Sequence, residues 1–147
     1  MKTNLAYLLV DKSRLVRRRF DESVRDHELT GPQARLLLLL GRSPGAHQAS
    51  YAEALEVEPI TLCRMADRLE EGGWLTRIAD PDDRRARLLH PTEKSRDITD
   101  KLRKTIDSML EDLMSGLNTE ERDELRRLLT KVGENTEIAA KAEVAHG

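Results

Sequence analysis

Hydrophobic residues recur at helical spacing over most of the chain. Near the N-terminus, the apolar positions at this spacing are Leu5, Leu8, Leu9, Leu15, Val16 and Phe20. They predict a long first helix. A second helix is expected to begin at Thr30, because its hydroxyl can accept an early backbone N–H while Gln33 reaches back in a capping box. Its five consecutive leucines, residues 36–40, cannot share one stripe, so we expect this helix to be central and to end at Gly41.

Two shorter helical patterns follow a turn at residues 43–48, which is predicted from its Pro and Gly. The first pattern has a face of small residues at Ala49 and Ala52. The second is expected to open at Pro59 and to end at Gly72, because Pro is favoured in a first turn and Gly after a last one. Its predicted buried stripe consists of Leu62, Met65, Ala66 and Leu69.

A strand, a charged loop and a returning strand are predicted next. Trp74, Leu75 and Ile78 favour the first strand, Leu88 and Leu89 favour the second, and the loop between them covers residues 79–86. Thr92 is then expected to cap a long apolar-striped helix. Asn118 with Glu121 predicts the cap of a terminal helix.

This order of elements is typical of a winged helix-turn-helix, and the predicted class is mostly α (α+β). A helix followed by a basic hairpin can occupy a major groove and the adjoining minor groove of duplex DNA together. We interpret residues 1–147 as a single domain, with the winged helix-turn-helix at residues 30–92. The helices at residues 1–29 and 93–147 flank it.

Composition and charge change this picture in two respects. Only 38% of the chain is hydrophobic and 35% is charged, so its core must be slim or shared, and a homodimer is the economical expectation. The formal charge of −2 means that binding to nucleic acid would depend on local clusters of Lys and Arg. It argues against a histone-like or membrane-surface protein.

The single cysteine, Cys63, excludes an intramolecular disulfide and favours a reducing compartment. We expect a small buried thiol here rather than a redox switch. Neither a signal peptide nor a membrane span is predicted, so we expect a cytoplasmic protein with no membrane partner.

Three segments carry a resemblance to a known family: LTGPQARLLLLL, LCRMADRLEEGGWLTR and DPDDRRARLLHPTEK. In order, they resemble the second helix, the recognition helix with its following strand, and the wing of the MarR family of bacterial transcriptional regulators, including its SlyA branch. The resemblance covers nearly the whole chain. It implies a homodimer whose N- and C-terminal helices form the dimerisation region and whose winged modules bind a palindromic operator, with repression as the expected outcome. By family analogy alone, it implies a small anionic or aromatic effector.

The expected contacts with DNA divide by role. Arg64 can donate two hydrogen bonds to guanine, so we predict direct base readout, with Ile60 and Thr61 beside it on the early turns. Arg84 and Arg85 suit a narrow minor groove, and the resemblance implies that Arg85 is inserted. The expected backbone contacts are Thr61, Arg68, Arg77 and Arg87.

Two further expectations concern the wing. Asp83 is expected to brace the turn by pairing with a nearby Arg. Two residues depart from the family pattern, which has Gly at the position of Ser95 and an aliphatic residue at that of Pro91. The second strand is therefore expected to end early.

Other interpretations remain open. Arg64 could be a solvated arginine paired with Glu58 or Asp67, and the DDRR run could serve solubility alone. The main rival is a winged-helix module that binds a partner protein without specific DNA binding. A small hydrolase or transferase ranks third, because we find no nucleophile with a base, no phosphate loop and no cofactor motif. The histidines lack metal-ligand spacing, so no metal is expected at His27, His47, His90 or His146.

Overall fold

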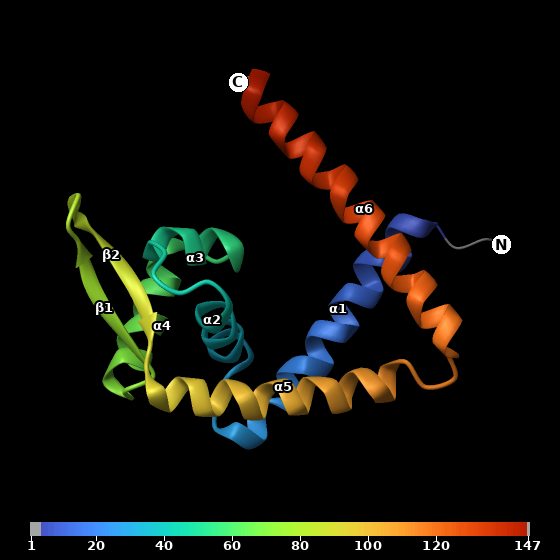
Figure 1. The fold of residues 1–147 in the computed structure, drawn as a ribbon, viewed down its shortest axis with the longest axis horizontal. Helices are drawn as coiled ribbons and strands as arrows, with labels where there is room; N and C mark the ends of the chain where they lie inside the picture. Colours follow the sequence, from blue (N-terminus) through green and yellow to red (C-terminus); the bar gives the residue numbers. More distant parts are fainter. Residues whose placement is uncertain (1–3, 147) are drawn as a thin grey trace. The chain divides into compact units, whose positions relative to one another are not determined.

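The computed structural model describes the backbone of residues 4–146 and the side chains of residues 4–136. The described chain is mostly helical with one two-stranded antiparallel sheet, which confirms the predicted fold class (Figure 1). In chain order the elements are α1 (Leu5–Ser23), η1 (Arg25–His27), α2 (Gly31–Arg42), α3 (Gln48–Ala54), α4 (Pro59–Glu71), β1 (Leu75–Asp80), β2 (Asp83–Pro91), α5 (Glu93–Leu113) and α6 (Thr119–His146).

The chain forms two compact units, Met1–Met109 and Leu110–Gly147, with the boundary inside α5. In the second unit, the predicted cap of α6 is confirmed. Glu121 N–H donates to Asn118 Oδ1 at 2.8 Å, and Asn118 N–H donates to Glu121 Oε2 at 2.9 Å. Arg122 Nη1 donates to both carboxylate oxygens of Glu111 at 3.1 Å, which holds the turn between α5 and α6. None of the helices in the described part of the chain combines the length and apolar composition needed to cross a bilayer.

The core of the first unit is built around α2, as its run of leucines predicts. The capping box is present, with Gln33 N–H donating to Thr30 Oγ1 at 3.2 Å and Thr30 N–H donating to Gln33 Oε1 at 3.1 Å. The helix buries Gly31, Ala34, Leu36, Leu37 and Leu40. Their cluster continues into α3, α4, both strands and α5. The winged helix-turn-helix therefore shares its core with the start of α5.

A close approach joins the end of α1 to the start of α2. A Cβ added at Gly31 would lie 1.9 Å from Asp21 Oδ1, so only glycine leaves room for this carboxylate. Asp21 in turn accepts a hydrogen bond from Arg35 Nη1 at 2.8 Å. The contact links the end of α1 to α2.

The sheet begins at Leu75, one residue after the predicted start at Trp74, and extends further than predicted. Leu75 pairs with Pro91 at its base, so the expectation that β2 ends early is wrong. Proline lacks only an N–H, and at the last position of an edge strand no ladder hydrogen bond depends on it. Ser95 is buried and forms a reciprocal cap with Thr92, whose N–H donates to Ser95 Oγ at 2.9 Å. The departure from Gly at this position thus helps α5 to begin.

Candidate nucleic-acid interface

Helix α4 presents one buried face and one polar face. Pro59 lies in its first turn and Gly72 caps its end, as predicted, while Leu62, Met65, Ala66 and Leu69 are buried. The candidate contact residues Ile60, Thr61, Arg64 and Arg68 are all exposed. The helix is therefore held from one side and free on the other, as a helix that enters a groove must be.

Within the described residues, Arg64 has no hydrogen bond or ion pair with another side chain. Glu58 does not pair with it, and Asp67 instead contacts Arg77. Arg68, Arg84 and Arg85 are also exposed, and their guanidinium groups have no partner in the described part of the chain. These side chains keep their donors available for a ligand.

The wing presents its arginines on a bulge. Ala79 pairs with Arg87 and Asp80 with Asp83, so residues 84–86 of β2 have no residue opposite them. A bulge of this kind twists the strand and redirects its side chains. Asp83 braces it, although its Oδ1 accepts from the backbone N–H of Arg85 at 3.0 Å rather than from an arginine side chain. The turn is shorter than the predicted loop, because β2 already begins at Asp83.

Arg77 lies in a different environment from the one expected of a phosphate contact. Its Nη2 donates to Asp67 Oδ1 at 2.5 Å and to Glu70 Oε1 at 3.0 Å, and its backbone N–H donates to Glu70 Oε2 at 2.9 Å. The hydrogen bond from Arg77 lowers the pKa of Glu70 and raises the pKa of Arg77 itself. This cluster ties β1 to α4 and uses the Nε and Nη2 donors of Arg77.

Arg87 is exposed, and its Nη1 donates to the carbonyls of Arg84 and Ala86 at 3.0 and 3.3 Å. It therefore supports the shape of the bulge from within. Its remaining donors face solvent.

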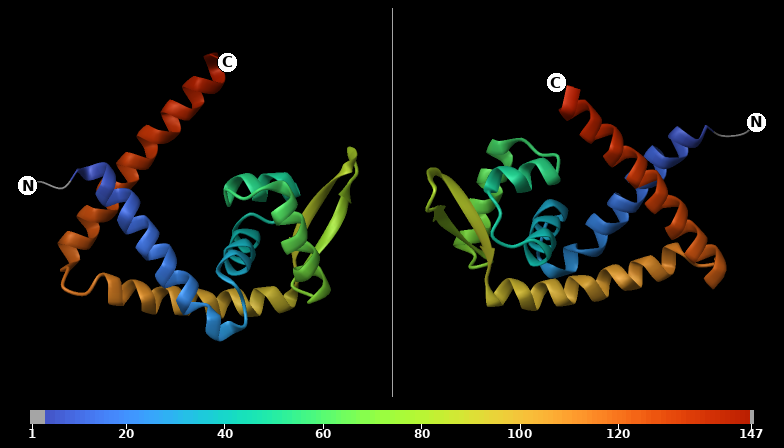
Figure 2. Two further views of the ribbon diagram at one scale, coloured as in Figure 1. Left: turned by 180° about the vertical axis from the view of Figure 1, so that it is seen from behind. Right: turned by 45° about the horizontal axis from the view of Figure 1, so that its top comes forward.

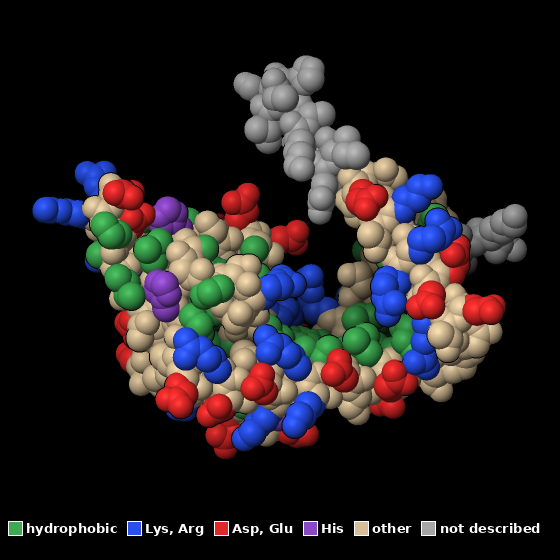
Figure 3. All heavy atoms as spheres, in the orientation of Figure 1, with side chains coloured by type: hydrophobic (Ala, Val, Ile, Leu, Met, Phe, Trp, Pro, Cys, Tyr) green, Lys and Arg blue, Asp and Glu red, His purple; other side chains and the backbone are tan. Residues whose placement is uncertain are grey.

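A groove of about 430 Å³ connects the wing to the helices. Its lining includes Pro59 at the start of α4, Ser50 on α3, and Asp83, Arg85 and Arg87 on the wing. The hairpin turn lies beyond α3 and α4, and basic side chains project from its tip (Figures 2 and 3). The start of α4 and the arginine bulge thus border one surface feature, which can follow a nucleic-acid strand.

The sequence did not predict one contact between α3 and the hairpin. His47 Nε2 lies 2.6 Å from Asp80 Oδ2, and backbone pairing between His47 and Leu88 brings the start of α3 against β2. The hydrogen bond with His47 lowers the pKa of Asp80, and the Asp82 N–H adds to the effect. The two residues are far apart in sequence and belong to no local motif, so no signal pointed to this contact.

The base of the wing contains a second missed contact. Lys94 Nζ lies 4.1 Å from the centre of the Trp74 ring and donates to the Gly72 carbonyl at 2.6 Å. This cation–π contact joins the first turn of α5 to the end of α4. It links α5 to the segment between α4 and β1.

Cys63 is half-buried rather than fully buried, which corrects the expectation for its thiol. Among the described residues, no three His, Cys, Asp or Glu side chains gather as metal ligands would. The side chain of His146 lies outside the described residues.

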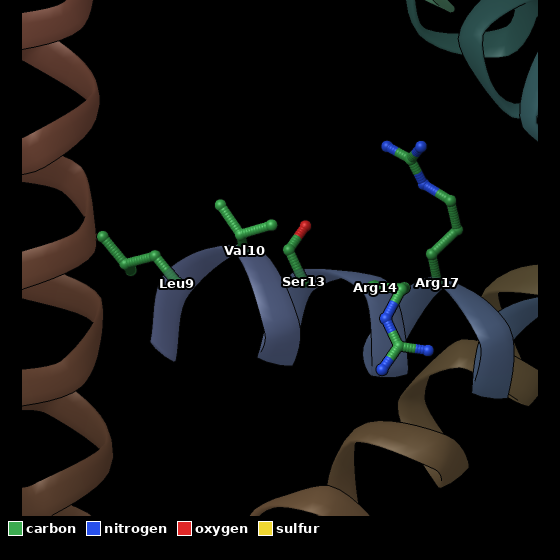
Figure 4. Close-up of a pocket in the computed structure, with 5 residues that line it drawn as sticks. All are labelled: Leu9, Val10, Ser13, Arg14 and Arg17. Carbon is green, nitrogen blue, oxygen red and sulfur yellow. The ribbon is translucent and has the colours of Figure 1, made fainter. Parts of the chain in front are cut away.

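A separate hollow of about 580 Å³ lies along α1, lined by Leu9, Val10, Ser13, Arg14 and Arg17. Figure 4 shows that Val10, Ser13 and Arg17 project to the same side of the helix. The hollow therefore combines apolar carbon with a guanidinium. Arg14 donates to Asp11 at 3.0 Å, which leaves Arg17 as its cation without a hydrogen-bond partner among the described residues.

Comparisons with known proteins agree with this geometry. The family model described as the MarR family matches residues 29–86. An HTH-type transcriptional regulator of Bacillus subtilis (strain 168), YybA, is 30% identical over 113 residues, which cover 77% of this chain and 75% of that protein.

Solved structures show the same fold. A crystal structure of MarR is 27% identical with a TM-score of 0.84, and covers 97% of this chain and 96% of its own. The transcriptional repressor CouR, bound to a 23-mer DNA duplex, is 31% identical with a TM-score of 0.74, and covers 88% of this chain and 92% of its own. On the sequence match, the shared fold and the winged helix-turn-helix described above, the chain belongs to the MarR family, whose members are transcriptional regulators and not enzymes.

Proposed function

We propose that this chain is a sequence-specific regulator that binds double-stranded DNA and represses transcription as a homodimer on a palindromic operator. The observation that carries the proposal is a pair of exposed basic features, one on α4 and one on the wing, of which the wing arginine lines a groove that also reaches the start of α4. Arg64 on α4 and Arg85 on the wing bulge have unpaired guanidinium groups, and the groove begins at Pro59 and reaches Arg85. The DNA complex of the related repressor CouR supports the same partner.

In the proposed complex, α4 lies in the major groove and the wing follows the adjoining minor groove. Arg64 donates to guanine, with Ile60 and Thr61 beside it. Arg85 enters the minor groove next to Arg84, while Thr61, Arg68 and Arg87 contact phosphates. Arg77 is left out, because its Nε and Nη2 already donate to Asp67 and Glu70.

The homodimer is supported by apolar side chains that remain on the surface of a single chain. On α1, Leu5, Leu8, Leu9, Leu15 and Val16 are 37–69% exposed, and on α6 Leu128, Leu129 and Val132 are 45–50% exposed. A second copy would cover them at a gain of about 25 cal/mol for each Å² of apolar surface. A symmetric pair would then present two α4 helices about 34 Å apart, one turn of DNA, to the two halves of a palindrome.

A small anionic or aromatic effector is part of the proposal. The hollow along α1 supports it, since Arg17 could pair with an anion while Val10 contacts a ring. Such a ligand would regulate DNA binding only if it bound one spacing of the two α4 helices more tightly than another.

The test begins with selection of bound duplexes from a random library. The selected duplex should bind much more tightly than a scrambled one, and its affinity should decrease steeply as salt rises, through counterion release. Arg85→Ala should weaken binding and reduce the salt dependence. Arg64→Ala should also relax the preference at one position of each half-site, by about 1–3 kcal/mol.

Arg96→Ala is the matched control, because Arg96 is exposed at the start of α5, at the opposite end of the hairpin from the wing tip. It should bind like the parent. If the selection yields no preferred sequence and weak binding to duplex DNA does not respond to salt, the proposal fails and the rival remains, a winged-helix module that binds a partner protein. In vitro transcription from a promoter that carries the selected site tests repression directly.

A further inference from the structure

Ile60 is an apolar residue on the polar face of α4. It is 59% exposed, although it follows Pro59 in the first turn of a helix whose buried residues are Leu62, Met65, Ala66 and Leu69. Packing within the described residues therefore leaves most of its side chain in water. A single exposed isoleucine needs no special explanation in general, but this one lies where the proposed function places a base edge.

Ile60 and Arg64 are four residues apart on this helix. Side chains at this spacing are neighbours on one helical face, with Cβ atoms about 5–6 Å apart. Both project from the side opposite the buried stripe, so a duplex that reaches the guanidinium of Arg64 also reaches the carbons of Ile60. The interaction of Ile60 with that duplex must then be apolar.

The major groove offers one apolar base feature. Thymine carries a C5-methyl group there, whereas guanine, adenine and cytosine present only donors and acceptors. An isoleucine placed over a cytosine or guanine edge would remove water from polar atoms and return no hydrogen bond. Placed over a thymine, it buries a methyl group against carbon.

We propose that Ile60 is a specificity-determining residue that selects a thymine in each half-site through its C5-methyl group. The inference rests on the proposed function and deepens it, because it names a base that α4 recognises without a hydrogen bond. Successive base pairs are about 3.4 Å apart along the duplex. The 5–6 Å between neighbouring side chains therefore places this thymine about one or two steps from the base that Arg64 reads.

The test removes a single methyl group from the DNA. In the selected duplex, each thymine is replaced in turn by uracil, symmetrically in both half-sites, and the affinities of the parent and of Ile60→Ala are compared. At one position, uracil should weaken binding of the parent about fourfold per half-site, as expected for one buried methyl group. The same replacement should leave the affinity of Ile60→Ala nearly unchanged. At that position, 5-methylcytosine should be tolerated better than cytosine by the parent alone.

Ile78→Ala is the matched control, because Ile78 is an isoleucine of similar exposure, 52%, on β1. It should keep the full response to uracil. Circular dichroism and binding to scrambled duplex show that Ile60→Ala is folded and still binds DNA.

Two results would overturn the inference while the proposed function stands. One is a selected site at which the parent ignores every replacement of thymine by uracil. The other is an equal loss of affinity in the parent and in Ile60→Ala. If no preferred sequence is selected at all, the proposed function fails and the inference fails with it.

Discussion

Helices α1 and α2 are both rich in leucine, yet their side chains have opposite environments. In α2, Leu36, Leu37 and Leu40 are completely buried. In α1, no residue is buried, and Leu5 and Leu9 are 69% and 41% exposed. The short helix η1 separates the two helices in the chain, and Asp21 near the end of α1 contacts both Gly31 and Arg35 of α2.

The difference separates a region whose apolar side chains are covered within one chain from a region whose apolar side chains are not. The winged module covers α2 with α3, α4, both strands and α5. The apolar stripe of α1 has no such cover in the described chain, and burying it would stabilise an association of two chains. The comparison therefore predicts that substitutions in α1 act on assembly and that substitutions in the module act on folding.

The largest effect is expected from charges placed on α1. Leu9→Glu with Val16→Glu would put two carboxylates per chain into the proposed interface, where each loses hydration without a partner. Dimerisation should weaken by about a thousandfold or more, equivalent to about 4 kcal/mol. Sedimentation equilibrium measures this. Tyr7→Glu is the control, because Tyr7 is exposed off the stripe and should leave assembly intact. A double variant that sediments like the parent would remove α1 from the interface.

The next effect concerns the core. Leu37→Ala should lower the free energy of unfolding by about 3 kcal/mol, within the 2–5 kcal/mol that cavities of this size cost. Leu8→Ala, made in the monomeric Leu9→Glu and Val16→Glu background, should cost less than about 1 kcal/mol, because Leu8 is already 37% exposed. Urea unfolding of both at several protein concentrations provides the measurement. Equal losses would mean that the two helices are equally buried in solution.

A smaller effect is expected at Tyr51, which ties the α2–α3 turn together. Its hydroxyl donates to the Ser43 carbonyl and accepts from the Ala46 N–H at 3.2 Å, and burial raises its pKa. Tyr51→Phe should lower the free energy of unfolding by about 1–2 kcal/mol, because both backbone groups lose their partner. Tyr7→Phe on the exposed part of α1 should change nothing measurable. No loss in Tyr51→Phe would indicate that water replaces the hydroxyl.

Local signals account for what the sequence predicted well. The caps at Thr30 and Asn118 are each built from residues three positions apart, and Pro59 and Gly72 mark the ends of α4 by their own backbone preferences. The leucine run of α2 indicated a covered helix because no single stripe could hold it. The exposure of Arg64 and Arg85 also follows from pattern, since both lie outside the apolar spacing.

Contacts between distant residues could not be predicted in the same way. Nothing near Arg77 indicates that its guanidinium pairs with Asp67 and Glu70, since the pairing depends on how β1 returns along α4. The bulge at residues 84–86 depends on a shift of register that alternation of residue types does not encode. The same holds for His47 and Asp80, which meet only when α3 packs against the hairpin.

The smallest effect on the free energy of unfolding is expected at Arg77. It extends the comparison of covered and uncovered regions from apolar side chains to charged ones. The module pairs Arg77 internally, whereas the exposed pair of Arg127 and Glu124 on α6 is fully in solvent. Arg77→Ala should lower the free energy of unfolding by about 1 kcal/mol, a value reduced for the partial exposure of Glu70. Arg127→Ala should have a smaller effect. The salt dependence of DNA binding should stay at the parental value in Arg77→Ala, because the guanidinium is not proposed to contact phosphate.

Low pH should abolish the difference in the free energy of unfolding between the parent and Arg77→Ala. The pKa of Glu70 is lower in the folded chain, chiefly through the hydrogen bond from Arg77. Its stabilising contribution is therefore complete above the unfolded-state pKa of about 4.3 and is lost as pH falls through the folded-state pKa. The urea midpoints of the parent and Arg77→Ala should differ at pH 7 and converge as the pH falls through the folded-state pKa of Glu70. A gap that persists at low pH would show that Arg77 stabilises the module by packing rather than by its charge, and a reduced salt dependence of DNA binding would return Arg77 to the interface.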